Sequence, residues 1–268
     1  MKYEIVFPGF PGRMLSSTMG WSSAVYIESG RDKILFDTAG PGRRIRIRER
    51  LHEMGVDTKE INLLILSHFH YDHAYNVDYF PNATIILHEI ESDWVRGNPD
   101  DYAIPPHLYQ AVQQTGRLML FRDDQEIAPG VETFLAPGHT PGGIALLLRD
   151  ADMPVTVIAG DAVKNMAELA TGHVPTAWDV AISAQSIKKI RDVAEVVIPG
   201  HDRALKVTDD EIVALTVLHE TIVIPPGVVH ADRPSNLELV VERNRLPKKA
   251  IGDGTVPEGC DPPFRSCR

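Results

Sequence analysis

Apolar residues in the first two-thirds of the chain fall in short runs separated by turn residues, which predicts strands and a few helices. β-Branched residues dominate the shorter runs, and Ser29-Gly30 between two of them is typical of a hairpin turn. The predicted strands are Tyr3–Phe7, Ala24–Glu28, Lys33–Asp37, Asn62–Leu66, Thr84–Leu87, Val131–Ala136, Ile144–Arg149, Pro154–Ala159 and Val196–Ile198. The predicted helices are Arg43–Met54, Glu89–Arg96 and Ala177–Ala194.

The sequence contains a faint internal repeat. Lys33–Gly40 resembles Val155–Ala162, and Leu63–His68 resembles Val196–His201. Two halves of similar strand–loop–helix construction would place both sets of loops at one sheet edge.

The chain changes character from Asp232 onward. Proline and glycine recur, charges mix, and apolar periodicity fades apart from Leu237–Val241. We therefore expect one domain at residues 1–231 and a C-terminal extension at 232–268. The extension would pack on the domain or on a partner subunit, and its last residues are candidates for disorder. Asn98–His107 is rich in proline and aspartate and is interpreted as a loop that could cover a site.

Composition narrows the function classes. The chain has 268 residues, 43% of them hydrophobic, which is enough for a sizeable core. Its net charge of -10 argues against a nucleic-acid binder, and the basic run Arg43–Arg50 is interpreted as a solvated helix face. The two cysteines, Cys260 and Cys267, exclude a disulfide scaffold. No apolar run is long enough to span a membrane and no secretory signal precedes Pro8, so we expect a cytoplasmic protein.

Seven histidine and aspartate residues follow apolar runs, where strands end and loops begin. Four of them crowd into Ser67–His73, directly after Asn62–Leu66. Imidazole and carboxylate are the ligands that divalent zinc, manganese, iron and cobalt prefer. The seven candidates are His68, His70, Asp72, His73, His139, Asp161 and His201. They are numerous enough to hold two ions.

The spacing within the cluster divides the ligands. His68 and His70 are two positions apart just past a strand end, so both imidazoles can reach one ion. Asp72 and His73 are adjacent and must diverge, which suits a second ion beside the first.

These segments resemble the metallo-β-lactamase superfamily over roughly residues 20–205. The resemblance is carried, in the family's order, by Phe36–Gly40, the His-x-His-x-Asp-His cluster, Gly138-His139-Thr140, Gly160-Asp161 and Gly200-His201. It implies an α/β fold, an αββα sandwich of two mixed β-sheets flanked by helices.

The resemblance also implies a dinuclear centre, with zinc as the expected metal and manganese, iron or cobalt as alternatives. His68, His70 and His139 would hold one ion. Asp72, His73 and His201 would hold the other, and Asp161 would bridge the two. Asp37 would support the ligand loops from behind.

This ligand set predicts a hydrolase. A hydroxide held between the ions would attack an ester-like or amide-like carbonyl, with Asp72 as a proton acceptor. The layout looks most like the small acyl-homoserine lactonases, which typically carry a tyrosine three residues after the bridging aspartate. Here that position is Lys164, which could stabilise an oxyanion, grip a carboxylate, or face solvent. Candidate substrate contacts are Tyr71, Tyr102 and His107.

Other functions stay open at this point. They are a thioester hydrolase like glyoxalase II, an RNA phosphodiesterase, a persulfide dioxygenase with one iron, and a binding module without activity. The expected partner is a small-molecule substrate rather than a membrane or nucleic acid, and a homodimer is a further expectation.

Overall fold

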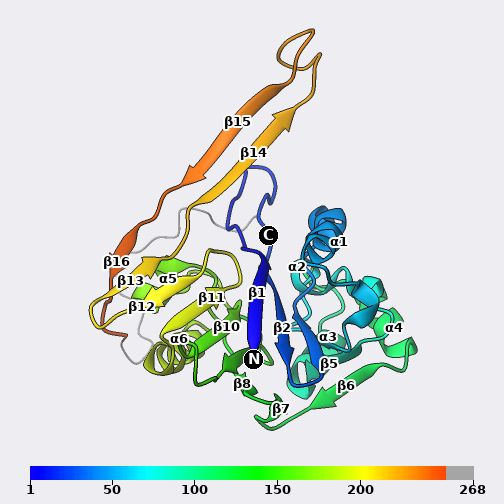
Figure 1. Cartoon of the computed structure of the whole chain (residues 1–268), viewed down its shortest axis with the longest axis vertical. Coiled ribbons are helices and arrows are strands. Elements are labelled where there is room, and N and C mark those ends of the chain that lie inside the picture. The colour runs from blue at the N-terminus through cyan, green and yellow to red at the C-terminus, as the bar shows by residue number, and fades with distance from the viewer. Residues whose placement is uncertain (252–268) are drawn as a thin grey trace.

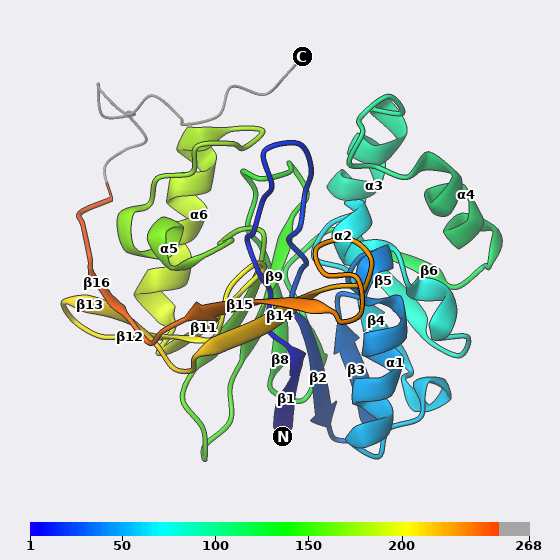
Figure 2. The ribbon, with the colours of Figure 1, turned by 90° about the horizontal axis from the view of Figure 1, so that it is seen from above.

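The structure of the chain is a computed structural model that describes residues 1–251. Two β-sheets face each other, and each carries helices on its outer side (Figures 1 and 2). The αββα sandwich predicted from the sequence is confirmed. None of the helices within these residues is both long and apolar enough to cross a bilayer.

The first sheet has the strand order β1-β2-β3-β4-β5-β6. Strands β1 to β3 pair antiparallel, whereas β3 to β6 pair parallel. The strands are β1 Lys2–Phe7, β2 Ala24–Ser29, β3 Asp32–Phe36, β4 Leu63–Ile65, β5 Thr84–His88 and β6 Leu118–Phe121. The helices connected to this sheet are η1 Pro41–Arg43, α1 Arg44–Glu53, η2 Thr58–Glu60, α2 Tyr71–Ala74, η3 Val77–Tyr79, α3 Glu89–Gly97 and α4 Pro106–Gln114.

The second sheet has the order β16-β13-β12-β11-β10-β9-β8-β7. Its pairs are antiparallel except β10 with β11. The strands are β7 Glu126–Ala128, β8 Val131–Leu135, β9 Ile144–Leu148, β10 Thr156–Gly160, β11 Val196–Pro199, β12 Leu205–Val207, β13 Glu211–Ala214 and β16 Arg245–Pro247. Helices α5 Met166–Thr171 and α6 Val180–Val193 cover its outer face.

Three apolar layers hold the sandwich together. The middle layer joins the two sheets, where Ile34 and Ile65 of the first sheet are buried in one cluster with Ile144 and Ile158 of the second. The outer layers lie between each sheet and its helices. Burial of apolar surface from both faces of each sheet explains why the strands are nearly continuous apolar runs.

The helices on the second sheet begin at side-chain caps. Asp179 accepts a hydrogen bond from the amide of Ile182, so α6 begins at Val180 rather than at the predicted Ala177. Asn165 caps α5 in the same way, and Gly172, with φ of 70°, ends that helix.

The segment predicted as a loop, Asn98–His107, is a loop only as far as Pro105, because α4 begins at Pro106. Proline fits the first position of a helix, since its φ is already helical and no amide hydrogen is needed there. The prediction was wrong at this end, because Pro106 starts a helix instead of continuing the loop.

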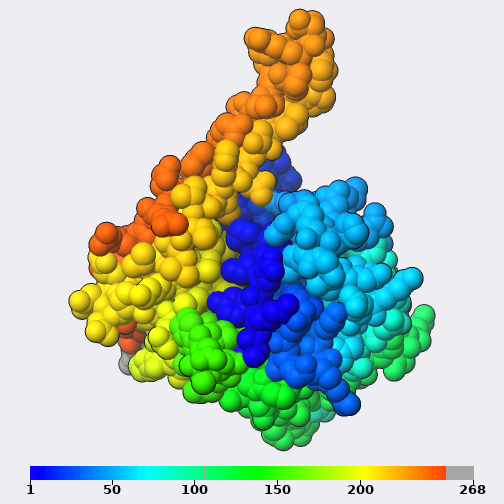
Figure 3. All heavy atoms as spheres, in the orientation of Figure 1, coloured from blue at the N-terminus to red at the C-terminus, as the bar shows by residue number. Residues whose placement is uncertain are grey.

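A β-hairpin projects from the body (Figures 1 and 3). Its strands are β14 Leu218–Ile224 and β15 Ser235–Val241, which pair along their full length. The register places apolar side chains on one face and mainly polar ones on the other. At the base, Arg203 donates hydrogen bonds to the carbonyls of Val241 and Glu242, each at 2.8 Å.

The hairpin lies across the predicted domain boundary, which falls at 231/232 in the connection between β14 and β15. The expected extension therefore begins inside a folded element. Cys260, Cys267 and the expected disordered end lie outside the described residues. The homodimer stays a prediction.

Candidate metal centre

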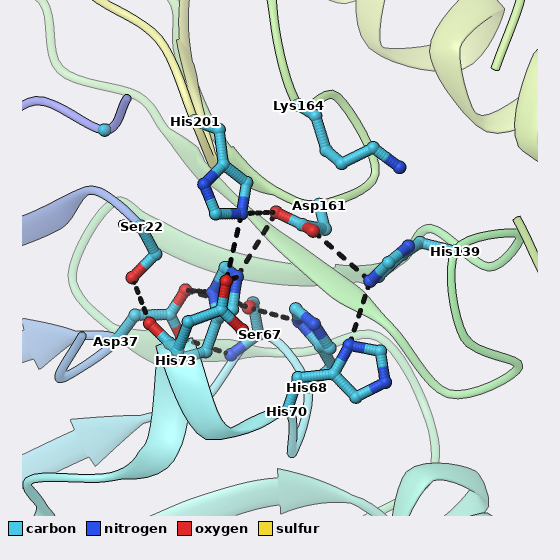
Figure 4. A network of polar contacts seen from close by, with 12 residues as sticks. Ser22, Asp37, Ser67, His68, His70, His73, His139, Asp161, Lys164 and His201 are labelled. Carbon is cyan, nitrogen blue, oxygen red and sulfur yellow. Dashed lines mark hydrogen bonds and ion pairs between the residues drawn. The ribbon is translucent and has the colours of Figure 1, made fainter. Parts of the chain in front are cut away.

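All seven predicted ligands lie at the edge where the parallel strands of both sheets end, and all of them except Asp72 are labelled in Figure 4. The four residues of the His-x-His-x-Asp-His cluster follow β4 and enter the short helix α2. His139 lies in the connection between β8 and β9. Asp161 follows β10 and His201 follows β11. Since β3 pairs parallel with β4 as β10 does with β11, the internal repeat marked equivalent positions in the two sheets.

Asp161 lies between the two sets of histidines. Its Oδ1 is 3.2 Å from Nε2 of His73 and 3.2 Å from Nε2 of His201. Its Oδ2 is 3.2 Å from Nε2 of His139. Each oxygen of one carboxylate thus faces a different set of imidazoles, which is the geometry that a bridging ligand needs.

The ligand atoms gather in groups that could each hold an ion. Within a group they lie no more than 4.8 Å from one another. One group is His68, His70 and His139, a second is Asp72, His73 and His201, and a third, between them, is His68, His73 and Asp161. The first two groups are the ligand sets implied by the family resemblance.

The donor atoms fit divalent metal ions. Several buried polar atoms of these residues have no hydrogen-bond partner within the described residues, among them Nε2 of His68, Nε2 of His73 and Oδ1 of Asp161. A buried polar atom without a partner is unfavourable, and a metal ion is the partner that several converging imidazoles and a carboxylate would share.

Hydrogen bonds behind the centre orient two of the histidines. Asp37 accepts at 2.7 Å from Nδ1 of His73, and it also accepts from the amide and hydroxyl of Ser67. Nδ1 of His201 donates to the carbonyl of Trp21 at 3.0 Å. Because the Nδ1 proton is used in this way, the neutral form of each ring directs the lone pair of Nε2 toward the centre.

The turn that carries Asp37 has an uncommon backbone. Asp37 and Ala39 have φ values of 58° and 56°. Asn76 holds the turn, because its side-chain amide donates to the carbonyls of Thr38 and Gly40 at 2.8 and 3.0 Å. The amide of Thr38 donates in turn to the carbonyl of His73 at 2.7 Å.

The electrostatics of the centre separate the histidines. Burial lowers the pKa of His68 and His139 well below the ordinary value, so both rings are neutral and ready to act as ligands. Burial would also lower the pKa of His73, but Asp161, Asp37 and Asp72 together raise it well above the ordinary value. Burial would raise the pKa of Asp161, but His201, His73 and His139 hold it well below its usual range.

A cavity of about 350 Å³ opens beside the centre. It is lined by Asp72, His139 and His201, by the loop that contains Phe10–Arg13, and by Lys164. A second cavity of about 380 Å³ lies toward Trp21 and the Gly40–Arg43 turn, and it shares Tyr71 and Asp72 with the first. Asp72 is therefore the predicted ligand that both cavities share.

Of the residues predicted to act on or contact the substrate, some line the cavity beside the centre and others do not. Tyr71 and Lys164 line the cavity. The Lys164 side chain is only 16% exposed; its Nζ donates to the carbonyl of Thr176 at 3.1 Å and lies 3.6 Å from Oε1 of Glu168. Tyr102 is 90% exposed and His107 is exposed, and neither lines this cavity. Substrate contact by any of these residues stays a prediction.

Sequence reasoning missed the polar residues that support the ligand loops. Ser22 donates to the carbonyl of Asp72 at 2.5 Å, and Glu91 accepts hydrogen bonds from two of the loops. Ser67 and Thr140 could have been found, because each is adjacent to a ligand histidine. Ser22 and Glu91 belong to no ligand motif, so no local signal marked them.

Comparisons with known proteins agree with this geometry. The sequence model of the Metallo-beta-lactamase superfamily matches residues 19–201. Metallo-beta-lactamase domain-containing protein 1 of Mus musculus is 27% identical over 201 residues, which are 73% of this chain and 69% of that protein. An N-acyl homoserine lactonase of Bacillus thuringiensis is 29% identical over 167 residues, 59% of this chain and 62% of that lactonase.

Solved structures share the fold. AidC, described as a dizinc quorum-quenching lactonase in complex with a product, superposes with a TM-score of 0.58 at 21% identity, over 70% of this chain and 76% of that one. Because the family match covers most of the chain and runs from before the Asp37 turn to His201, the chain belongs to the metallo-beta-lactamase superfamily, whose members are typically hydrolases.

Proposed function

We propose that this chain is a hydrolase that uses two divalent metal ions, with zinc as the expected metal, to open a lactone or ester bond. The proposed substrate class is acyl-homoserine lactones or related small lactones. The observation that carries the proposal is the position of Asp161, whose two oxygens face separate sets of histidines. The lactonase among the relatives and the dizinc lactonase among the solved structures support it.

Separate groups of residues would hold the two ions. His68, His70 and His139 would hold one ion; Asp72, His73 and His201 would hold the other; and Asp161 would contact both. Two such ions would supply Lewis acidity toward a carbonyl oxygen and lower the pKa of water toward neutrality. No serine or cysteine nucleophile is then needed.

Asp72 is the proposed proton acceptor. Its Oδ2 lies 3.4 Å from Nε2 of His201, and its side chain is 21% exposed, toward the cavity. Ser22 holds the backbone of Asp72 through its carbonyl, so the carboxylate is presented from a fixed turn. A group in this place can take a proton from the attacking water and remain in contact with the centre.

Lys164 is the proposed stabiliser of the substrate's carbonyl oxygen. An ammonium group has three protons; Lys164 donates one to the carbonyl of Thr176, and Glu168, at 3.6 Å, is its ion-pair partner. A remaining proton can serve a substrate oxygen, because Lys164 lines the cavity beside the centre. Because Glu168 already balances the lysine charge, we favour a developing oxyanion over a free carboxylate as its partner.

The test is a substrate panel run on zinc-loaded protein and on the same protein after chelation. We expect hydrolysis of acyl-homoserine lactones or other small lactones, measured by pH-stat, that chelation abolishes and added Zn²⁺ restores. Asp78→Asn, which alters an exposed carboxylate outside the centre, is the matched control and should keep full activity. Absence of turnover above the chelated sample on every lactone and ester would refute the proposal.

The same panel separates the alternatives. Thioesters and single-stranded RNA test the glyoxalase II-like and phosphodiesterase functions. Metal analysis that finds one iron per chain, together with oxygen uptake on a persulfide, would indicate the dioxygenase instead.

A further inference from the structure

Glu91 is a buried carboxylate that the proposed chemistry does not use. It lies in the first turn of α3, and none of its surface is exposed. It lines neither cavity beside the centre. A buried carboxylate is costly, and burial raises the pKa of Glu91 to about 7 although its hydrogen bonds oppose this. A helix that only had to pack on the sheet would carry an apolar side chain here.

The hydrogen bonds of Glu91 join two ligand loops. Its Oε1 accepts from the amide of Phe69 at 3.0 Å, and Phe69 lies between His68 and His70. Its Oε2 accepts from the hydroxyl of Thr140 at 2.7 Å, and Thr140 directly follows His139. The amide of Gly142 donates to the same carboxylate. One side chain therefore connects the loops that supply all three histidines of the first ion-binding group.

The loop that contains Thr140 and Gly142 also packs closely against the first turn of α3. A Cβ atom at Gly142 would lie 2.1 Å from the amide nitrogen of Glu91 and 2.5 Å from its Cα, so only glycine lets this loop rest on the first turn of α3. Thr140 is fully buried there. Helix α3 is itself fixed at its start, because the side chain of His88 accepts from the amide of Ile90 and contacts the carbonyl of Arg122 at 2.8 Å.

We propose that Glu91 is a positioning residue that sets the separation of the two loops, and thereby the zinc affinity of the group His68, His70 and His139. Nδ1 of His70 and Nε2 of His139 lie 3.0 Å apart, so a small shift of either loop changes how both reach one ion. Without the carboxylate, three buried donors lose their acceptor, and the loops must move to find others. The inference rests on the proposed metal-dependent function.

The main test is Glu91→Gln, which keeps the shape but replaces one oxygen with a donor. At least one of the three donors then lacks an acceptor. We expect the zinc affinity of one of the two sites to fall by about 10- to 100-fold, measured by titration against a competing chelator, while the other site changes little. The visible spectrum of the cobalt-substituted protein should change, because it reports the geometry of the ligands and not turnover.

Thr140→Val supplies a second variant in case Glu91→Gln does not fold. It removes one donor to Glu91 at nearly constant volume, so we expect a smaller loss of zinc affinity at the same site. The double variant should lose less than the sum of the two single losses, because both act through one contact.

Ser92→Ala is the matched control. Ser92 is the next residue on α3, and its buried hydroxyl hydrogen-bonds to Tyr109 and makes no hydrogen bond to either ligand loop. Its loss should lower the melting temperature but leave the zinc affinity and the cobalt spectrum unchanged. If Glu91→Gln and Thr140→Val behave like this control, Glu91 is only structural and the inference is overturned. If the unaltered protein binds no zinc, the proposed function fails as well, so the two failures are distinguishable.

Discussion

Asp37 and Asp161 occupy matching places in the two halves of the sandwich and have opposite electrostatics. Each directly follows a strand that pairs in parallel with the next ligand-bearing strand, and each is almost fully buried. Burial raises the pKa of Asp37, and its one histidine partner opposes this only in part. Three histidines hold the pKa of Asp161 well below its usual range.

The difference lies in what each carboxylate faces. Asp37 contacts Nδ1 of His73 and both donors of Ser67, so it orients a ligand from behind. Asp161 faces Nε2 of three histidines and belongs to the centre itself. The first residue after the strand is thus a supporting residue in one half and a proposed ligand in the other. One imidazole contacts the carboxylate of Asp37, whereas three converge on that of Asp161.

The largest effect should come from Asp161→Ala, which removes the carboxylate that faces both sets. We expect the metal content to fall from two ions to one or none, and hydrolysis to fall by about a thousandfold, since the charge that joins the two groups is lost. Metal analysis of the dialysed protein and initial rates measure this. Full metal content with full activity would show that Asp161 only supports the centre, as Asp37 does.

Asp37→Asn should have a smaller effect. The amide can still accept one hydrogen bond, but it no longer attracts the His73 proton with a full charge. We expect zinc binding to weaken by about 10- to 100-fold with the fold retained, measured by chelator competition and circular dichroism. A loss as large as that of Asp161→Ala would break the distinction between the two aspartates.

Lys164→Met tests a further asymmetry between the halves. The third residue after Asp161 is Lys164, whereas the third after Asp37 is Gly40. We expect kcat/KM to fall by about 10- to 100-fold through loss of oxyanion stabilisation, with both ions still bound. Unchanged kinetics with a lower melting temperature would indicate that the lysine serves only to balance the buried Glu168.

The smallest effect concerns an exposed carboxylate. A hydrogen bond from Arg44 lowers the pKa of Asp78, so the pair contributes stability above the unfolded pKa of about 3.9 and loses it as pH falls. We expect Arg44→Gln to lower the free energy of unfolding at pH 7 by less than about 1 kcal/mol. This deficit should disappear near pH 2, as measured by urea unfolding across pH. A larger loss in the free energy of unfolding would contradict the expectation that this exposed pair matters less than the buried aspartates.

The sequence was sufficient to find the residues that gather at the proposed centre, because each one follows a strand within a local motif. His70 and His139 are 69 residues apart, yet the family resemblance already implied that both belong to one group. Glu91 and Ser22 were missed because their roles depend on contacts between distant segments.

The hairpin of β14 and β15 was missed for a different reason. Glu220 interrupts the apolar face of β14 and pairs with Arg43 of the body at 3.0 Å, so the alternation looked irregular. The connection between the strands contains Pro225, Pro226 and Pro234, which do not interrupt the pairing there.

The left-handed backbone conformations of Asp37 and Ala39 bear on how the protein would bind metal ions. Such conformations cost about 1–3 kcal/mol each and persist only where the surroundings enforce them. Here the enforcement comes from Asn76 and from the backbone of His73, which are protein groups. Folding alone therefore orders the turn behind the proposed ligands. Binding of an ion should then cost little further conformational entropy. In contrast to a zinc finger, the domain should stay folded after chelation and should bind metal again when metal is added back.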